Sequence, residues 1–394
     1  MFPLSAFYFL YFTGLGVFFP YFTVYLRENA GLNGAEVGLV MAVTPLVGIV
    51  AQPFWGQVAD RSGARATVLS LVTLAGAAAC AALALADGFS AFVLGTALMA
   101  SVATAVIPIS LSLTFGALHG RGPHAFGRVR VWGSIGYLLA VALYPPMLHR
   151  LAPAAADGVE PALRSLFPLT AAFMVAAALL WPWLPRGGAT ALRAPRGEWR
   201  VLLRSTPLRR LILYSFGGYL FLQGPTGLFP LFIRARGGNL VTVGRMWVAM
   251  LLLEIPLILL AGAGLRRLGA RGLLGLGVLA GGVRWLGCGL SDDMAVIYVL
   301  QLLHGVVVTG LLLGGPMYAE QVVPQSLRST AQSLLSVIAV GLGGILSNTL
   351  TGWMIDAYGA NLPFILGGIG GILLGCAVPL VLPKTTTENT ENHG

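Results

Sequence analysis

Gly56-Gln57-Val58-Ala59-Asp60-Arg61-Ser62-Gly63-Ala64-Arg65 lies between the second and third long apolar runs of the chain. A related stretch, Gly262-Ala263-Gly264-Leu265-Arg266-Arg267-Leu268-Gly269-Ala270-Arg271, follows the eighth run, 206 residues later. Glycines permit a tight turn between closely spaced helices, and Asp60 is placed to pair with an arginine or a helix end. We expect the first copy to be a gating or structural element, with Gly56, Asp60, Arg61, Gly63 and Arg65 as its motif residues. A plain basic turn is the alternative, and it fits the second copy better because that copy lacks the acid.

A second match supports an internal duplication. Phe19-Pro20-Tyr21-Phe22 lies near the end of the first apolar run, and Phe229-Pro230-Leu231-Phe232 lies near the end of the seventh, at an offset of 210 residues. Many transporters consist of two related halves, so the two similar offsets predict two equivalent halves in parallel.

Composition indicates that lipid surrounds this chain. Of its 394 residues, 57% are hydrophobic and 10% are charged, whereas soluble domains carry about 25% charged residues. The mean hydropathy is +0.83. This balance argues against a large soluble enzyme. The net charge of +10 comes from basic residues in short gaps between apolar runs, which is not typical of a nucleic-acid-binding surface.

A helix needs about 20 apolar residues to cross the hydrocarbon. Twelve such runs can be placed, and we expect an all-α membrane protein with two pseudo-symmetric six-helix bundles. The expected bundles are residues 1–184 and 208–383, with a cytoplasmic loop at 185–207 and a disordered tail at 384–394. The expected spans are Ser5–Tyr25, Glu36–Val58, Thr67–Ala86, Ser90–Leu118, Val129–Leu148, Leu163–Leu184, Leu208–Ile233, Val241–Leu265, Gly272–Leu290, Met294–Ala319, Ser329–Ile355 and Asn361–Leu382.

The distribution of basic residues predicts the orientation. With the N-terminus in the cytoplasm, 17 of the 24 lysines and arginines lie in cytoplasmic segments, six lie outside and Arg284 lies within a span. This distribution satisfies the positive-inside rule. We therefore expect a multi-pass protein of the inner membrane with both termini in the cytoplasm.

The segment Gly56 to Arg65 resembles the loop signature of the major facilitator superfamily, and the resemblance covers the whole chain. Gly127-Arg128-Val129-Arg130-Val131-Trp132-Gly133, Arg284 and His304 are similar to the lactose-permease and phenylpropionate-permease branch. The resemblance implies transport by alternating access, with a small molecule and protons as partners. We expect a monomer without cofactor, bound metal or nucleic acid.

Ionisable residues inside a membrane are costly and indicate function. Glu254, Arg284 and His304 fall at similar depth near the middle of three consecutive spans. A purely structural ion-pair network is one interpretation, but transporters place substrate and coupling sites at this depth. We expect Arg284 and His304 to bind substrate, and Glu254, with His304, to carry the coupled proton.

Arg130 and Tyr137 are the candidates from the other half. Hydropathy alone places Arg130 near a membrane surface, where its side chain would reach the headgroups. The family resemblance instead implies that Arg130 faces a central cavity and contacts substrate. Tyr137 corresponds to an aromatic residue that stacks on sugar in the lactose-permease pattern, although packing alone is equally consistent with a tyrosine here.

The departures from that pattern bear on the substrate. Ser112 and Val307 stand where the lactose-permease pattern has carboxylates, and Gln301 replaces a basic residue. These changes predict an anionic substrate, foremost an aromatic or other monocarboxylate of the phenylpropionate type. A sugar or nucleoside symporter, a drug/proton antiporter, and a membrane-embedded receptor or enzyme are the alternatives. The chain has no protease, esterase or phosphate-binding motif, so we do not expect an enzyme.

Overall fold

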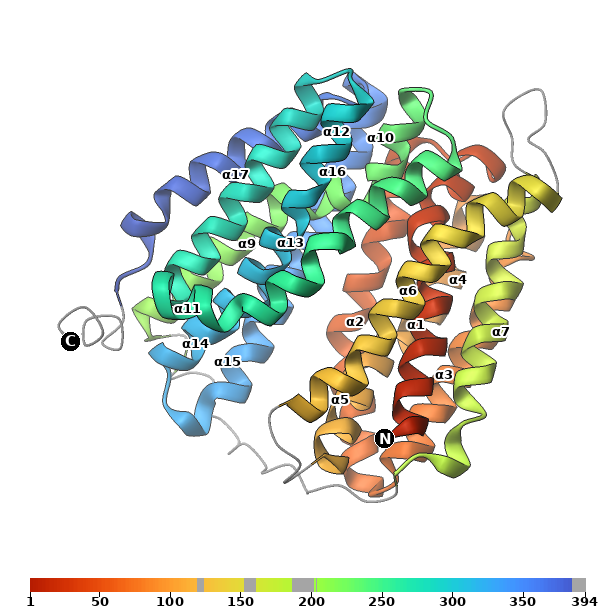
Figure 1. Ribbon diagram of the computed structural model, residues 1–394, viewed down its shortest axis with the longest axis horizontal. Coiled ribbons are helices and arrows are strands. Elements are labelled where there is room, and N and C mark those ends of the chain that lie inside the picture. Colours follow the sequence, from red (N-terminus) through yellow and green to blue (C-terminus); the bar gives the residue numbers. More distant parts are fainter. Residues whose placement is uncertain (119–123, 152–160, 186–201, 203, 385–394) are drawn as a thin grey trace. The chain divides into compact units, whose positions relative to one another are not determined.

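A computed structural model describes the chain except for residues 119–123, 152–160, 186–201, 203 and 385–394 (Figure 1). The described part is helical apart from short turns and contains no strand. Most of the predicted loop at 185–207 and nearly all of the predicted tail at 384–394 lie outside the described residues.

Two sets of helices follow one another along the chain. The first set is α1 (Phe2–Val24), α2 (Gly34–Ser62), α3 (Arg65–Leu83), α4 (Gly88–Ala103), α5 (Val106–Ala117), α6 (His124–Leu151) and α7 (Leu166–Ala178). The second set is α9 (Thr206–Gly227), α10 (Phe229–Ala235), α11 (Leu240–Leu290), α12 (Met294–Leu300), α13 (His304–Thr309), α14 (Gly315–Val322), α15 (Arg328–Leu335), α16 (Gly343–Tyr358) and α17 (Leu362–Val381). Short π-helical turns at Tyr25–Asn29, Gly310–Gly314 and Ser336–Leu342 continue α1, α13 and α15.

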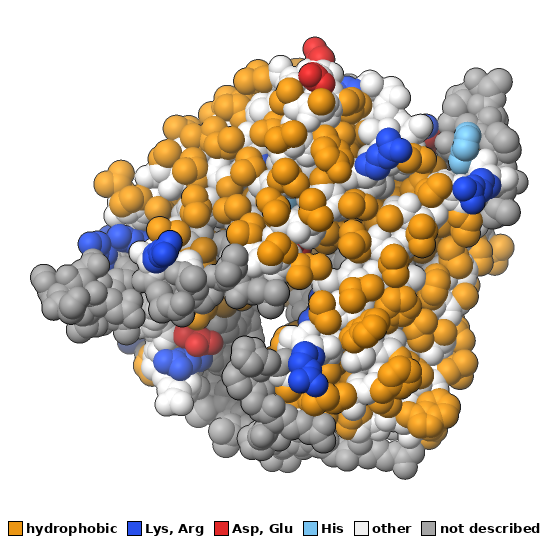
Figure 2. Space-filling model, viewed as in Figure 1, with side chains coloured by type: hydrophobic (Ala, Val, Ile, Leu, Met, Phe, Trp, Pro, Cys, Tyr) orange, Lys and Arg blue, Asp and Glu red, His pale blue; other side chains and the backbone are white. Residues whose placement is uncertain are grey.

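Eleven helical segments of the described chain are long and apolar enough to cross a membrane. The predicted seventh span is not among them: α9 is long enough, with 22 residues, but it carries Arg209 and Arg210 near its start and is less apolar. Its helix is also interrupted at Leu228, before α10. The face shown in Figure 2 is covered mainly by hydrophobic side chains, as a lipid-exposed surface requires. The prediction of an all-α, multi-pass membrane protein is confirmed.

The chain forms two compact units. The first contains Met1–Leu192 and Ile233–Arg245, and the second contains Arg193–Phe232 and Met246–Gly394. The segment from the end of α10 to the start of α11 thus packs with the first unit, although it follows the start of the second set of helices. The proposed division at residues 185–207 stays a prediction.

In the first unit, α1 packs against α6 and α7 (Figure 1). Small residues allow α1 and α6 to approach closely: a Cβ added to Gly16 would lie 2.7 Å from the Tyr137 carbonyl oxygen, and one added to Gly136 would collide with the Phe9 carbonyl. Without water in the hydrocarbon, this close packing is what holds membrane helices together.

Proline in α6 creates a polar group that α1 satisfies. Pro145 has no N–H, so the carbonyl of Val141, four residues earlier, loses its usual helical partner. The hydroxyl of Tyr21 on α1 donates to that carbonyl at 3.0 Å. Tyr21 therefore supplies, from a neighbouring helix, the hydrogen bond that the proline removes.

An ion pair holds the segment Ile233–Arg245 within the first unit. The Arg234 Nε donates to Glu28 Oε1 at 2.6 Å and Nη2 donates to Oε2 at 2.8 Å, which is a bidentate geometry. The two side chains are only 18% and 20% exposed. Gly244, farther along the segment, lies so close to Tyr21 and Val141 that a Cβ would meet both within 3 Å.

In the second unit, α9 packs against α16 and α17. The backbone N–H of Gly224 donates to the Ser347 hydroxyl at 2.6 Å, and a side chain at Gly224 would collide with α16. The later part of α11 approaches α17 where Gly282 meets Gly371. Backbone contact between glycines again sets the helix spacing.

The Glu28–Arg234 pair can be tested with a charge exchange. Glu28→Arg alone places two cations together and should lower the free energy of unfolding of the first unit by about 1–2 kcal/mol. This loss is smaller than for a fully buried ion pair, because both side chains are partly exposed to solvent. Combining Glu28→Arg with Arg234→Glu should restore much of the loss. Thermal midpoints of the purified protein measure both changes. Equal midpoints for the wild type and Glu28→Arg would contradict this role.

Candidate functional site

Arg284 forms the centre of a polar cluster in the second unit. It lies on the later part of α11 and is 0% exposed. Its Nε and Nη2 both donate to Gln301 Oε1, at 2.9 and 2.7 Å, and its Nη1 lies 2.9 Å from His304 Nδ1. A fully buried guanidinium is tolerated only when its donors are paired in this way.

Gln301 is held in the orientation that Arg284 needs. It lies in the short turn Gln301–Leu303 between α12 and α13, and its Nε2 donates to the Ile297 carbonyl at 2.7 Å. The same nitrogen lies 3.3 Å from the Cys288 sulfur. Because the amide nitrogen has acceptors on one side, the amide oxygen is directed toward the guanidinium.

Aromatic rings cover the face of the guanidinium. The Arg284 Cζ lies 3.8 Å from the centroid of the Trp285 ring and 5.9 Å from that of Phe229. A cation over an aromatic face is stabilised most strongly where water is excluded. Arg284 is therefore enclosed by rings on its face and by hydrogen-bonding partners at its edge.

The contact with Arg284 fixes the tautomer of His304. A guanidinium can only donate, so the Nδ1 that faces it must be the unprotonated, accepting nitrogen. In the neutral ring the proton then resides on Nε2, which lies 3.9 Å from Glu254 Oε2. The hydrogen-bond pattern thus directs the N–H of His304 toward the carboxylate, across a gap too long for a direct hydrogen bond.

Gly305 allows Glu254 and His304 to meet. Glu254 lies on the earlier part of α11, and a Cβ on Gly305 would be 2.8 Å from its backbone nitrogen and from the carbonyl carbon of Leu253. A larger residue at 305 would separate α13 from α11. The structure therefore brings together all three residues that the sequence placed at a common depth.

Arg130 and Tyr137 lie in the first unit, on α6. The Arg130 Cζ is 4.1 Å from the Phe12 ring centroid and 5.5 Å from that of Tyr8. The Tyr8 hydroxyl is in turn 3.2 Å from Thr114 Oγ1. Tyr137 is half-buried against the core of this unit. The substrate roles of Arg130 and Tyr137 stay predictions.

Each copy of the loop motif contains a glycine with a positive φ, but the backbone conformations differ, because ψ is 0° at Gly63 and 172° at Gly269. Gly63 and Gly269 have φ values of 63° and 67°, which favour glycine. Gly56 has open space around it and Arg61 is exposed. The gating role of the motif residues Gly56, Asp60, Arg61, Gly63 and Arg65 stays a prediction.

The arginines that end the two copies have different partners. The Arg65 Nε and Nη2 donate to Asp60 Oδ1 at 3.0 and 2.7 Å. The Arg271 Nη1 donates to the Leu382 carbonyl at the end of α17, at 3.2 Å. In the second copy, which lacks the acid, a helix end thus takes the place of the carboxylate.

The sequence did not identify Gln301, Phe229 or the Glu28–Arg234 pair as parts of these arrangements. Gln301 carries one weak signal, because it is a polar residue one turn before His304 on the same apolar segment. Glu28 and Arg234 carry none, since each lies at the end of an apolar run where charges are ordinary.

Comparison with known proteins identifies the family. A model of the MFS_1 like family matches residues 1–366. The chain belongs to this family of major facilitator transporters. It is 30% identical over 390 residues to a maltose permease of Geobacillus stearothermophilus, covering 98% of this chain and 94% of that one. It is 27% identical over 315 residues to a probable 3-phenylpropionic acid transporter of Escherichia coli, covering 75% and 76%.

Solved structures show the same fold. A point mutant of the nucleoside transporter NupG superposes with a TM-score of 0.85 at 16% identity, covering 96% of this chain and 98% of that chain. The inward-open xylose transporter XylE of E. coli gives 0.74 at 12% identity, covering 98% and 96%. The predicted major facilitator fold is confirmed, and the protein is a membrane transporter.

Substitution of Gln301 tests the pairing with Arg284. Gln301→Leu leaves a buried guanidinium without its main acceptor and should lower the free energy of unfolding by about 3 kcal/mol. The double variant Arg284→Met/Gln301→Leu removes both polar partners and should be less destabilised than Gln301→Leu alone. Thermal midpoints in detergent measure both. A double variant that is at least as unstable as Gln301→Leu would contradict the pairing.

Proposed function

We propose that the protein is a proton-coupled symporter of a neutral, hydroxyl-rich solute, of the sugar or nucleoside class, that works by alternating access. The observation that carries this proposal is the enclosure of Arg284, which is 0% exposed and bound at its edge by Gln301 and His304. A carboxylate substrate would have to displace these partners before it could form a bidentate pair.

Glu254 and His304 are the groups that a solute can reach. Their side chains are 22% and 13% exposed. The Glu254 carboxylate accepts hydrogen bonds, and His304 Nε2–H donates one. A sugar hydroxyl both accepts and donates, so one hydroxyl can bridge the 3.9 Å between these groups. A carboxylate ligand cannot do this, because it would oppose the charge of Glu254.

Proton coupling follows from the same carboxylate. Ionised Glu254 accepts hydrogen bonds and balances the charge of Arg284, whereas protonated Glu254 donates and leaves that charge unbalanced. A solute that fits one of these two states better than the other shifts the protonation equilibrium, which links solute binding to proton binding. The fixed tautomer of His304 assigns it the part of a neutral donor, with Glu254 as the proton carrier.

The relatives agree with this class of substrate. Their names include permeases for maltose, raffinose, lactose and sucrose. We place the transporter in the inner membrane with cytoplasmic termini, which the basic residues of the predicted cytoplasmic segments support.

An aromatic monocarboxylate is the second candidate. The similarity to a probable 3-phenylpropionic acid transporter favours it, as does Arg130, whose guanidinium lies over two aromatic rings and is not fully buried. In this alternative Arg130, not Arg284, would hold the carboxylate.

Proteoliposomes with an imposed pH gradient test the proposal. Wild-type protein should accumulate a disaccharide or a nucleoside, and Glu254→Gln should abolish this accumulation while sparing exchange between equal concentrations on the two sides, because only the proton-driven step needs an ionisable group. Glu320→Gln, which changes an exposed carboxylate of the same unit, is the control and should transport normally.

The same assay separates the candidates when 3-phenylpropionate is included. Uptake of 3-phenylpropionate alone, lost in Arg130→Gln, would replace the sugar proposal with the monocarboxylate one. Uphill uptake by Glu254→Gln would remove Glu254 from the coupling role whichever solute is moved.

A further inference from the structure

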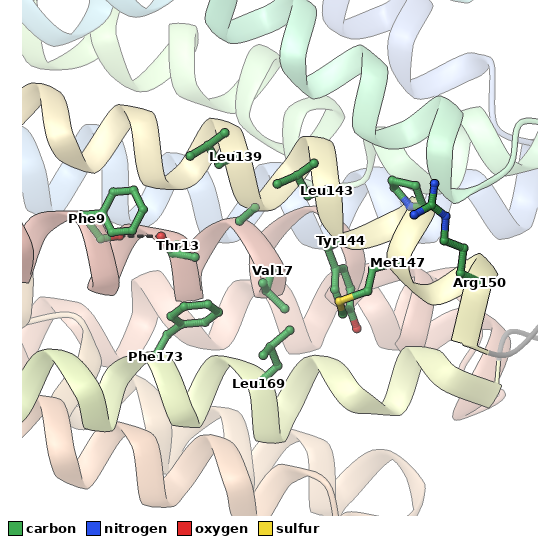
Figure 3. A pocket seen from close by; sticks show the side chains of 12 residues that line it. Phe9, Thr13, Val17, Leu139, Leu143, Tyr144, Met147, Arg150, Leu169 and Phe173 are labelled. Atoms are coloured by element: carbon green, nitrogen blue, oxygen red, sulfur yellow. Dashed lines mark hydrogen bonds between the residues drawn. The ribbon is translucent and has the colours of Figure 1, made fainter.

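The first unit has an apolar cavity of about 680 Å³ that shares no residue with the Arg284 cluster. It is lined by α1, α6 and α7, and Figure 3 shows Phe9 and Val17 from α1, Met147 from α6, and Phe173 from α7 along it. All of its lining residues belong to the first unit. The transport chemistry proposed above does not use them.

The uncharged polar groups of the lining are already bound within the protein. The Thr13 hydroxyl donates to the Phe9 carbonyl at 2.6 Å (Figure 3). The Tyr144 hydroxyl lies 3.0 Å from Ser165 Oγ. A polar solute would therefore lose its hydration along this cavity without compensation. An alkyl chain would not.

Arg150 is the charged member of the lining. It is exposed at the end of α6, where the membrane-spanning stretch Ala125–Arg150 stops. The guanidinium therefore lies at the depth of lipid headgroups, at one end of an apolar cavity. A ligand that fits has an apolar chain and a negative group at one end.

The part of the lining that lies on α6 is about as long as one leaflet is thick. It extends from Leu139 to Arg150, which is about 16 Å at 1.5 Å per residue. Half of the hydrocarbon thickness is about 15 Å. An acyl chain that follows α6 from the headgroup region thus reaches about the bilayer centre at Leu139, and the lining on α1 continues to Phe9 beside Gly136.

The cavity is open at the surface of the first unit. Leu143, on its rim, is 61% exposed, and Leu139 and Met147 are also exposed. Pro146 is part of the lining and follows Pro145 in α6. Because proline has no N–H, neither residue offers a backbone donor to a ligand in the cavity. An acyl chain can enter sideways from the bilayer without any opening of the helices.

We propose that this cavity is a binding site for an anionic glycerophospholipid, with one acyl chain between α6 and α7 over α1 and the phosphate on Arg150. Guanidinium and phosphate form strong charge-assisted hydrogen bonds. Basic residues at the membrane surface select anionic headgroups.

Native mass spectrometry of the delipidated full chain tests the site. The protein is titrated with phosphatidylglycerol or phosphatidylcholine of identical acyl chains. Wild type should bind the anionic lipid about fivefold more tightly, as one basic residue at a lipid surface contributes. Arg150→Gln should lose this preference. Arg210→Gln, an exposed arginine of the second unit, should keep it.

Further measurements distinguish a bound phospholipid from a free anion or a fatty acid. Met147→Trp narrows the cavity and should weaken binding of both lipids, with an unchanged thermal midpoint showing that the fold is intact. Arg150→Gln with an undiminished preference for phosphatidylglycerol would overturn the proposal. So would displacement of the lipid by inorganic phosphate alone, or tighter binding of palmitate than of phosphatidylglycerol, since these outcomes assign the site to a free anion or a fatty acid.

Discussion

The enclosure of Arg284 constrains the second unit more than any other interaction. A guanidinium with no exposed surface needs hydrogen-bond acceptors from nearby segments. Gln301, in the turn between α12 and α13, and His304, at the start of α13, supply them. Gly305 then has to be small, because α13 approaches α11 at that point. The position of Glu254 beside His304 follows from the same approach. One buried charge thus determines the tautomer, the spacing and the chemistry of the cluster.

Glycine and proline determine the helix contacts in both units. Gly16 and Gly136 let α1 and α6 touch at the backbone, and Gly282 and Gly371 do the same for α11 and α17. Pro145 frees a carbonyl that Tyr21 then binds. In lipid, where apolar side chains gain little from each other, contact at the backbone and satisfied carbonyls provide much of the stability. The high glycine content is therefore part of the packing.

The sequence predicted the fold well, because apolar runs, basic gaps and the repeated glycines at 63 and 269 are local signals. It also placed Glu254, Arg284 and His304 together, since depth can be counted along a helix. It could not predict that the Arg284 guanidinium donates both of its hydrogen bonds on one side to Gln301, because such pairing depends on side-chain orientation. Because the hydrogen bonds of Arg284 are already used within the protein, the site favours a neutral solute over the anion that the sequence predicted. The seventh span was predicted as continuous, but the structure interrupts it at Leu228.

The segment Ile233–Arg245 has a consequence for how the polypeptide is tied together. The chain passes from the first unit to the second within the central loop, returns for this segment, and leaves again before Met246. Cleavage in the central loop would therefore still leave a stretch of the later fragment inserted among the helices of the earlier one. The two fragments would stay associated through noncovalent contacts: the ion pair between Glu28 and Arg234 and the close packing of Gly244 against Tyr21 and Val141. The two parts of the chain are thus connected in two independent ways, covalently through the central loop and noncovalently through the inserted segment.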